Sequence, residues 1–143
     1  MDFTAMPKAS PDSHIVTNDG FYPDLDTAEL IQQYAVETEF SMKDEMLVYH
    51  LTLATHDVNQ LLRAYRLQQG DKTDWLNPLL YKHAVYSLAK AQLLFSRFGT
   101  THRDQRAAQQ LQASDNEPYW RENSMLAIRK LQGISPTFTV SLL

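Results

Sequence analysis

The sequence predicts an all-α protein, an antiparallel bundle of four to five helices with an extended N-terminal arm and a β-like C-terminal tail. Apolar residues recur at alternating spacings of four and three over long segments, which is the period of an amphipathic helix. Each of the four glycines falls where such a segment begins or ends. Strand-like alternation is confined to two short stretches. We therefore expect an arm over residues 1–20, one helical bundle domain over 21–133 and an extended tail over 134–143.

A chain of 143 residues is long enough to bury one core, and its composition argues against several classes of protein. Its 17 acidic and 13 basic residues give a net charge of -4, which disfavours a surface built to grip nucleic acid or an anionic membrane. It has no cysteine, so we expect no disulfide and no thiolate metal site. We find no secretory signal and no apolar run of the ~20 residues that a membrane helix needs, and we expect a soluble protein.

Charge is unevenly placed along the chain, because residues 1–45 carry ten acids and only two lysines. One explanation is that helix starts collect acids and helix ends collect bases, as the helix dipole favours. The other is a self-complementary surface, on which the acidic end of one copy meets the basic end of the next in a ring or dimer. Both explanations remain open.

The stretch GFYPDLDTAEL, residues 20–30, combines a helix start with residues that a helix start does not require. Asp26 is the expected N-cap and Glu29 stands at capping-box spacing. Leu25 and Leu30 have the spacing of a hydrophobic staple. The preceding Phe-Tyr-Pro, residues 21–23, is not explained by capping, and we interpret it as an aromatic anchor for the chain's own core or for an adjacent subunit.

Five segments have helical patterns. We expect a first helix from Thr27 to about Glu39 and a second over 42–68, capped by Ser41. The second helix carries a buried stripe formed by Leu47, Leu51, Ala54, Val58, Leu61 and Tyr65. A third helix is expected from Pro78 to Phe98, stopped by Gly99, with small residues that would let a neighbour approach closely.

A polar, glutamine-rich segment over 101–113 is expected to be a weakly docked helix, and a last helix is expected between the cap Asn116 and Gly133. The tail alternates apolar with polar residues at period two. A lone strand has no partner for its main chain, so this tail must pair with the β-like residues 14–17, lie extended on the helices, or add to another chain.

The sequence offers no recognisable chemistry, so we expect no catalytic, cofactor or metal site and no enzyme. No two histidines are three or four residues apart, and no glycine-rich phosphate loop or nucleophile elbow is present. His83, Lys90 and Arg97 are spaced by sevens and fall on one face of the third helix. They form either a solvated face or an interface stripe for acids of a neighbour or for the DNA backbone.

Several segments resemble the head completion protein family of P2-like tailed bacteriophages, often called gpL. The resemblance is carried by FYPDLD (21–26), VNQLLRAYRLQQG (58–70), YKHAVYSLAKAQLL (81–94) and WRENSMLAIRKLQG (120–133), followed by the β-like tail. Their order and spacing match over about residues 20–143. Where family members often carry Trp, this chain has Tyr22 and Tyr65.

The resemblance implies a structural virion protein of the neck, a connector adaptor that assembles in the host cytoplasm. It would bind the portal vertex after DNA packaging, retain the genome and form the platform for the tail. Its partners would be itself in a ring of twelvefold symmetry, the portal protein, a tail terminator or other neck protein, and packaged DNA, with no membrane. Alternatives are a transient helical assembly factor or a small DNA-binding regulator. The interface residues we expect are Phe21, Tyr22, Pro23, Asp24, Asp26, His83, Lys90, Arg97, Phe138, Val140, Leu142 and Leu143.

Overall fold

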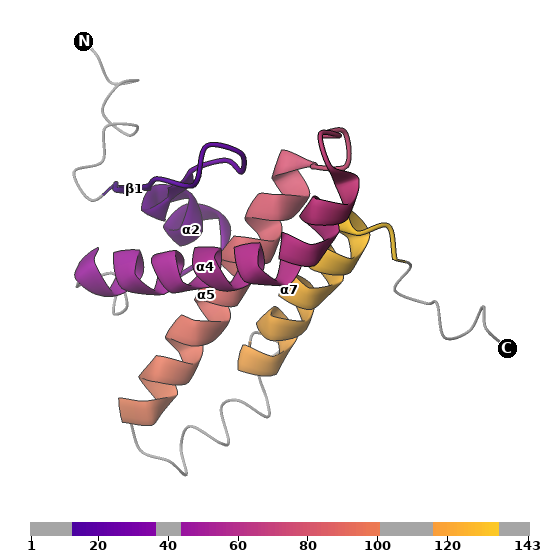
Figure 1. Cartoon of the computed structure of the whole chain (residues 1–143). Helices are drawn as coiled ribbons and strands as arrows, with labels where there is room; N and C mark the ends of the chain where they lie inside the picture. The colour runs from indigo at the N-terminus through magenta and orange to yellow at the C-terminus, as the bar shows by residue number, and fades with distance from the viewer. Residues whose placement is uncertain (1–12, 37–43, 101–115, 135–143) are drawn as a thin grey trace, which may run out of the picture.

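A computed structural model describes residues 13–36, 44–100 and 116–134, with the side chains of 97–100 excepted (Figure 1). The described part is mostly helical, which confirms the all-α class. Its elements are β1 (Ile15–Val16), β2 (Leu25–Asp26), α2 (Thr27–Gln33), α4 (Asp44–Gln69), α5 (Pro78–Thr100) and α7 (Glu117–Leu131). The expected helix over 101–113 and the C-terminal tail lie outside the described residues.

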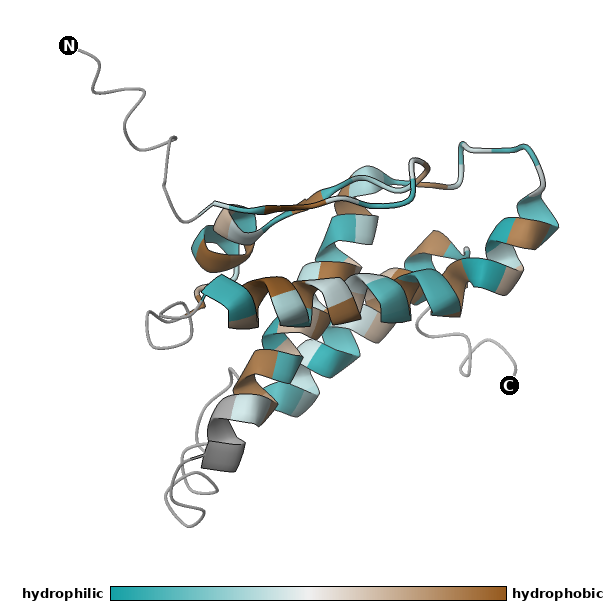
Figure 2. Ribbon diagram, turned by 60° about the vertical axis from the view of Figure 1, so that its left-hand side comes forward, coloured by the Kyte–Doolittle hydropathy of each residue, from teal (hydrophilic) through white to brown (hydrophobic). Residues whose placement is uncertain are grey.

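The central element is α5, which is buried on nearly all sides between Ala84 and Ala91. Helix α7 runs back along it in the opposite direction, while α4 crosses the pair obliquely (Figure 1). The expected antiparallel bundle therefore holds for α5 and α7, whereas α4 departs from it. Figure 2 shows hydrophobic and hydrophilic residues alternating along each helix, as amphipathic packing requires.

Small residues allow the close approach of α5 and α7 that the sequence predicts. The Ser124 hydroxyl on α7 donates a hydrogen bond of 2.7 Å to the main-chain carbonyl of Ala84 on α5, inside the core. The start of α7 is also as expected, because the Asn116 side chain accepts from the N–H of Tyr119. The helix ends before Gly133, whose φ of 74° suits glycine.

The buried stripe of α4 differs from the predicted one near its end. Leu47, Leu51, Ala54 and Val58 are buried, but the next buried position is Leu62, with 0% exposure, and Leu61 is 48% exposed. A straight helix has 3.6 residues per turn, so a strict four-and-three pattern drifts off the core face over several turns. The prediction that Leu61 belongs to the stripe is wrong for that reason.

Residues 13–26 form a short antiparallel hairpin on the helices. Ile15 lies opposite Asp26 and Val16 opposite Leu25. Val16 and Leu25 are both buried in the core. The sequence predicts an arm over residues 1–20. In its described part, the β-like stretch has a partner nearby in its own chain, which is Leu25–Asp26.

Helix α2 is shorter than predicted, since it ends at Gln33 and not near Glu39. Its C-cap is Tyr34, and the next residue, Ala35, has a positive φ of 52°. A side chain from the central helix meets the main chain here: the Lys90 ammonium donates hydrogen bonds to the carbonyls of Tyr34 and Ala35, at 2.6 and 3.4 Å. A cation at a helix C-terminus satisfies carbonyls that have no partner within the helix.

The N-terminus of α2 is closed by a tyrosine of α5. As predicted, the Asp26 carboxylate caps the helix by accepting from the N–H of Ala28. Glu29, however, does not reach back to the Asp26 N–H as a capping box would. The Tyr86 hydroxyl accepts from that N–H at 2.9 Å and donates to the Glu29 carboxylate at 2.5 Å. Tyr86 thus completes the cap and ties it to the central helix.

We predict that Tyr86→Phe lowers the free energy of unfolding by about 1–3 kcal/mol, because the Asp26 N–H loses its partner inside the structure and the Glu29 oxygen keeps only its 3.4 Å contact with the Lys82 ammonium. Urea denaturation measures this change. Tyr49→Phe removes the same atom from a side chain that is 58% exposed and serves as the matched control. Equal midpoints for the two variants would contradict the assigned role of the Tyr86 hydroxyl.

Candidate functional site

The loop between the two strands, residues 17–24, carries the aromatic and acidic residues that the sequence singles out, and α4 and α5 fix its shape. Asn18 is the main connection. Its side-chain amide donates to the Pro23 carbonyl and to the Tyr81 hydroxyl, both at 2.9 Å, and its side-chain oxygen accepts from Asn59 at 3.0 Å. The Tyr81 hydroxyl in turn donates to Asn59 at 2.5 Å. One closed polar network therefore joins the loop to both long helices.

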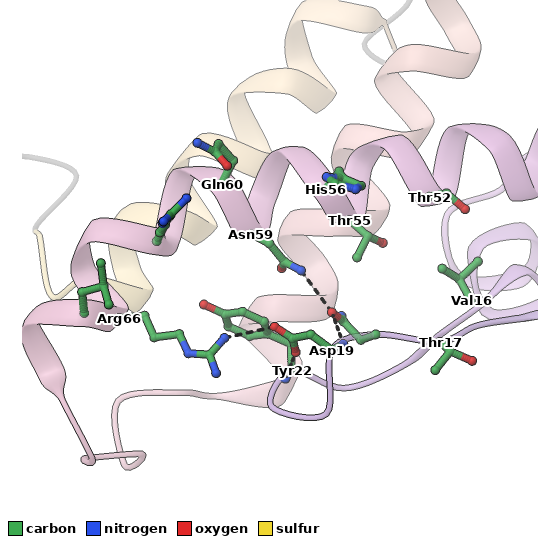
Figure 3. A pocket seen from close by; sticks show the side chains of 13 residues that line it. Val16, Thr17, Asp19, Tyr22, Thr52, Thr55, His56, Asn59, Gln60 and Arg66 are labelled. Carbon is green, nitrogen blue, oxygen red and sulfur yellow. Dashed lines mark hydrogen bonds and ion pairs between the residues drawn. The ribbon is translucent and has the colours of Figure 1, made fainter.

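Asp19 forms the turn at the tip of the loop. One carboxylate oxygen accepts from the N–H groups of Phe21 and Tyr22, at 3.0 and 3.1 Å, and the other accepts from Arg66 at 3.0 Å (Figure 3). Gly20 follows with a φ of 93°, a conformation that strains other residues. Burial alone would raise the pKa of Asp19, but the two N–H groups and the Arg66 guanidinium outweigh it and hold this pKa below its ordinary value.

The aromatic residues of the loop pack on their own chain. Tyr22 is 4% exposed and stacks on Tyr81, with ring centroids 4.6 Å apart. Phe21 is half-buried beside Trp75, and the Arg66 guanidinium lies 3.9 Å above its ring. The motif was interpreted as an anchor for the chain's own core or for an adjacent subunit. Tyr22 packs in its own core, so little of its side chain is available to a partner.

The two acids of the motif also have structural partners. Asp24 accepts a hydrogen bond from the Asn18 N–H at 2.7 Å, which closes the loop, while its side chain remains exposed. Asp26 caps α2 and accepts from the Ser13 hydroxyl at 2.9 Å. An interface with another chain can therefore use Asp24 directly, whereas Asp26 is committed to the helix start.

The sequence analysis left two interpretations of the basic stripe on α5, and the solvent-exposed face is wrong for Lys90. That side chain is 2% exposed, bonded to the end of α2, and its ammonium lies 5.0 Å from the centroid of the Trp120 ring. It cannot reach DNA without unfolding the junction. His83 is half-buried and shares a hydrogen bond of 2.7 Å with the Tyr34 hydroxyl. The Arg97 side chain lies outside the described residues.

Burial also changes the acid-base properties of this junction. Desolvation, and then the positive charge of Lys130, lower the pKa of His83, which favours the neutral imidazole. Desolvation, and then the negative charge of Glu29, raise the pKa of Tyr34 to about 12. These groups lie where the end of α2 meets α5 and α7.

A groove of about 740 Å³ runs between α4 and the segment 16–19 (Figure 3). Val16, Thr17 and Asp19 line it on the hairpin side, and α4 contributes polar side chains with two arginines. Those α4 residues are Thr52, Thr55, His56, Asn59, Gln60, Arg63, Arg66 and Leu67. The sequence analysis did not single out this groove, because nothing in the sequence shows that residues 16–19 return to α4.

The described residues contain no group of three or more histidines or acids placed to hold a metal ion. The helices described are also too short or too polar to cross a membrane. The predicted tail residues Phe138, Val140, Leu142 and Leu143 fall outside the described part. The features that remain are a fixed loop, a polar groove and exposed apolar side chains on a mostly helical protein.

The comparison with protein families identifies the class more closely. The family model described as phage head completion protein (GPL) matches residues 16–143. The chain therefore belongs to this family of structural phage proteins, as the resemblance indicated. No curated protein and no solved structure matches the chain. Membership implies a place in the virion and contact with other phage head or tail proteins.

Asp19 makes a pH-dependent contribution that can be measured. Because its pKa is lower in the folded than in the unfolded protein, its stabilisation is present above about pH 4 and is lost as the pH falls through the folded pKa. The free energy of unfolding should decrease between pH 6 and pH 3, and we predict that this decrease is smaller in Asp19→Asn than in the unsubstituted protein. The difference should be less than about 1 kcal/mol, because the pair of Asp19 with Arg66 is partly exposed.

Urea unfolding at the two pH values measures this effect. Asp71→Asn alters an exposed acid in the turn after α4 and serves as the control. If the free energy of unfolding of Asp19→Asn depends on pH as it does in the unsubstituted protein, protonation of this carboxylate does not affect stability and the prediction is wrong.

Proposed function

We propose that this protein is a connector adaptor of the virion neck. It binds the portal vertex after DNA packaging, keeps the genome inside the head and provides the platform for the tail terminator or another neck protein. The observation that carries the proposal is the family match over residues 16–143.

The exposed surface of α4 supports an interaction role. Met46, Tyr49 and Leu53 are exposed and spaced by three and four, so they share one face of the helix. Leu67, near the end of the helix, is 71% exposed. Exposed apolar side chains that gather on one face are typical of surfaces covered by a partner. In the assembled neck, that partner would be the portal protein or another copy of this chain.

We further propose that the copies form a ring that follows the twelvefold symmetry of the portal. Identical subunits in a ring make head-to-tail contacts, so each copy presents two different surfaces. The acidic N-terminal third and the more basic remainder of the chain would supply complementary charges for such a contact. Assembly takes place in the host cytoplasm, and the ring encloses the packaged DNA.

The C-terminal tail is proposed to bind a partner chain through Phe138, Val140, Leu142 and Leu143. We predict that a chain ending at Ile134 keeps the thermal midpoint of the full chain within about 4 °C, a shift that corresponds to roughly 1 kcal/mol for a domain of this size. It should nevertheless be missing from purified particles, because the surface that docks it has been removed. Circular dichroism and quantitative mass spectrometry of particles measure the two properties.

A full-length chain with Thr139→Ala is the control for this truncation, because it retains the whole apolar set of the tail. A truncated chain that is unfolded would show that the tail belongs to the core. A truncated chain that still enters particles in full number would contradict a docking role for the tail.

A further inference from the structure

We propose that the groove between β1 and α4 receives residues 136–143 of a neighbouring copy, which add a third strand beside β1. The inference deepens the proposed ring and rests on it, because it assigns the contact between successive subunits. Three features carry it: an edge of β1 that pairs with none of the described residues, the groove beside that edge, and a segment with the pattern of a strand.

The unpaired edge follows from the hydrogen bonds of the hairpin. The Asp26 N–H donates to the Tyr86 hydroxyl, so it points away from β1, and the pair of Ile15 with Asp26 is therefore a non-hydrogen-bonded pair. In such a pair the main-chain groups of both residues point outward. The N–H and carbonyl of Ile15 consequently face the other edge of β1, and by alternation those of Thr17 do as well.

The groove offers space beside this edge. Val16 and Thr17 line one side and Thr52, Thr55 and His56 of α4 line the other (Figure 3). Val16 and Thr55 are buried, whereas Thr17 and His56 are exposed. A strand laid along β1 would thus meet the buried Val16 side on one face and the exposed polar groups on the other, while its main chain bonds to the outer edge of β1.

Residues 136–143 match this environment in their sequence. Phe138, Val140 and Leu142 alternate with Thr137, Thr139 and Ser141, so a strand would place the apolar set on one face and the hydroxyl set on the other. The apolar set would contact the Val16 side of the groove. Pro136 stands at the first position, where a proline does not interrupt the pairing that follows.

The length of the segment favours a neighbouring copy over the same chain. The described chain ends at Ile134, on the side of the molecule opposite β1 (Figure 1). Nine extended residues span at most ~30 Å. To reach β1 of its own chain, the segment would first have to run along the groove beside α4, from Arg66 back to Thr52. That distance is ~21 Å at 1.5 Å per residue, so few residues would remain to pair with β1. From an adjacent copy, the whole segment is available for pairing.

Engineered disulfides test the contact, since the chain contains no cysteine of its own. Two full-length chains of different mass are assembled together into particles, one with Thr17→Cys and the other with Thr139→Cys or Ser141→Cys. The side chain of residue 17 and the hydroxyl set lie on the same face of the expected sheet, so at least one of these pairs should join two chains on oxidation. Val140→Cys is the matched control, because its side chain would point to the opposite face.

The expected result is a covalent product with the summed mass of the two chains for residue 139 or 141, and at least tenfold less of it for residue 140. Equal yields at all three positions would overturn the strand geometry. In a separate variant that carries Thr17→Cys and Thr139→Cys in one chain, linkage within that chain and none between chains would show that the tail folds back on its own groove. No linkage at any position would show that another segment or partner occupies the groove.

The same particles separate this inference from the proposed function. If the chain is present in them and no disulfide forms, the groove contact is wrong and the neck role stands. If the chain is absent from particles made with the unsubstituted sequence, the neck role itself is wrong.

Discussion

Two tyrosine hydroxyls on α5 hold the N-terminal hairpin in place, and the other features of the surface depend on them. Tyr81 closes the network with Asn18 and Asn59, and Tyr86 completes the cap of α2 between Asp26 and Glu29. Both hydroxyls act in a largely buried setting, where an unpaired donor or acceptor is costly. Burial accordingly raises the pKa of both tyrosines, which keeps them protonated as donors.

The pattern of apolar residues predicted the long helices and their caps, because local periodicity and capping act within a few residues of sequence. What it missed depends on contacts across the fold. The early end of α2 follows from Lys90, 55 residues away from Ala35, and this contact also removes Lys90 from the predicted basic stripe. Likewise, spacing alone identified Glu29 as half of a capping box, but Tyr86 stands 57 residues further on and takes its place.

The expected interface residues also divide into features that local sequence predicts and features that depend on distant contacts. The sequence identified Asp26 of the motif FYPDLD as a helix cap, whereas only the fold shows that Tyr22 is a core aromatic and that Asp24 is an exposed acid. Arg66 pairs with Asp19 and covers Phe21, a contact that spans 47 residues of sequence and that no local pattern predicts. The family model and the residue pattern agree on a structural phage protein, and the fold adds a groove beside β1, where we propose that copies of the chain are joined.

The central claim is that this chain is a stoichiometric part of the virion neck. Quantitative mass spectrometry of purified, DNA-filled particles tests it most directly, by counting this chain against the portal protein. The account predicts one copy for each portal subunit, retained in the mature particle. Absence from the particle, or a ratio far below one, would contradict it and would favour a transient assembly factor or a regulator.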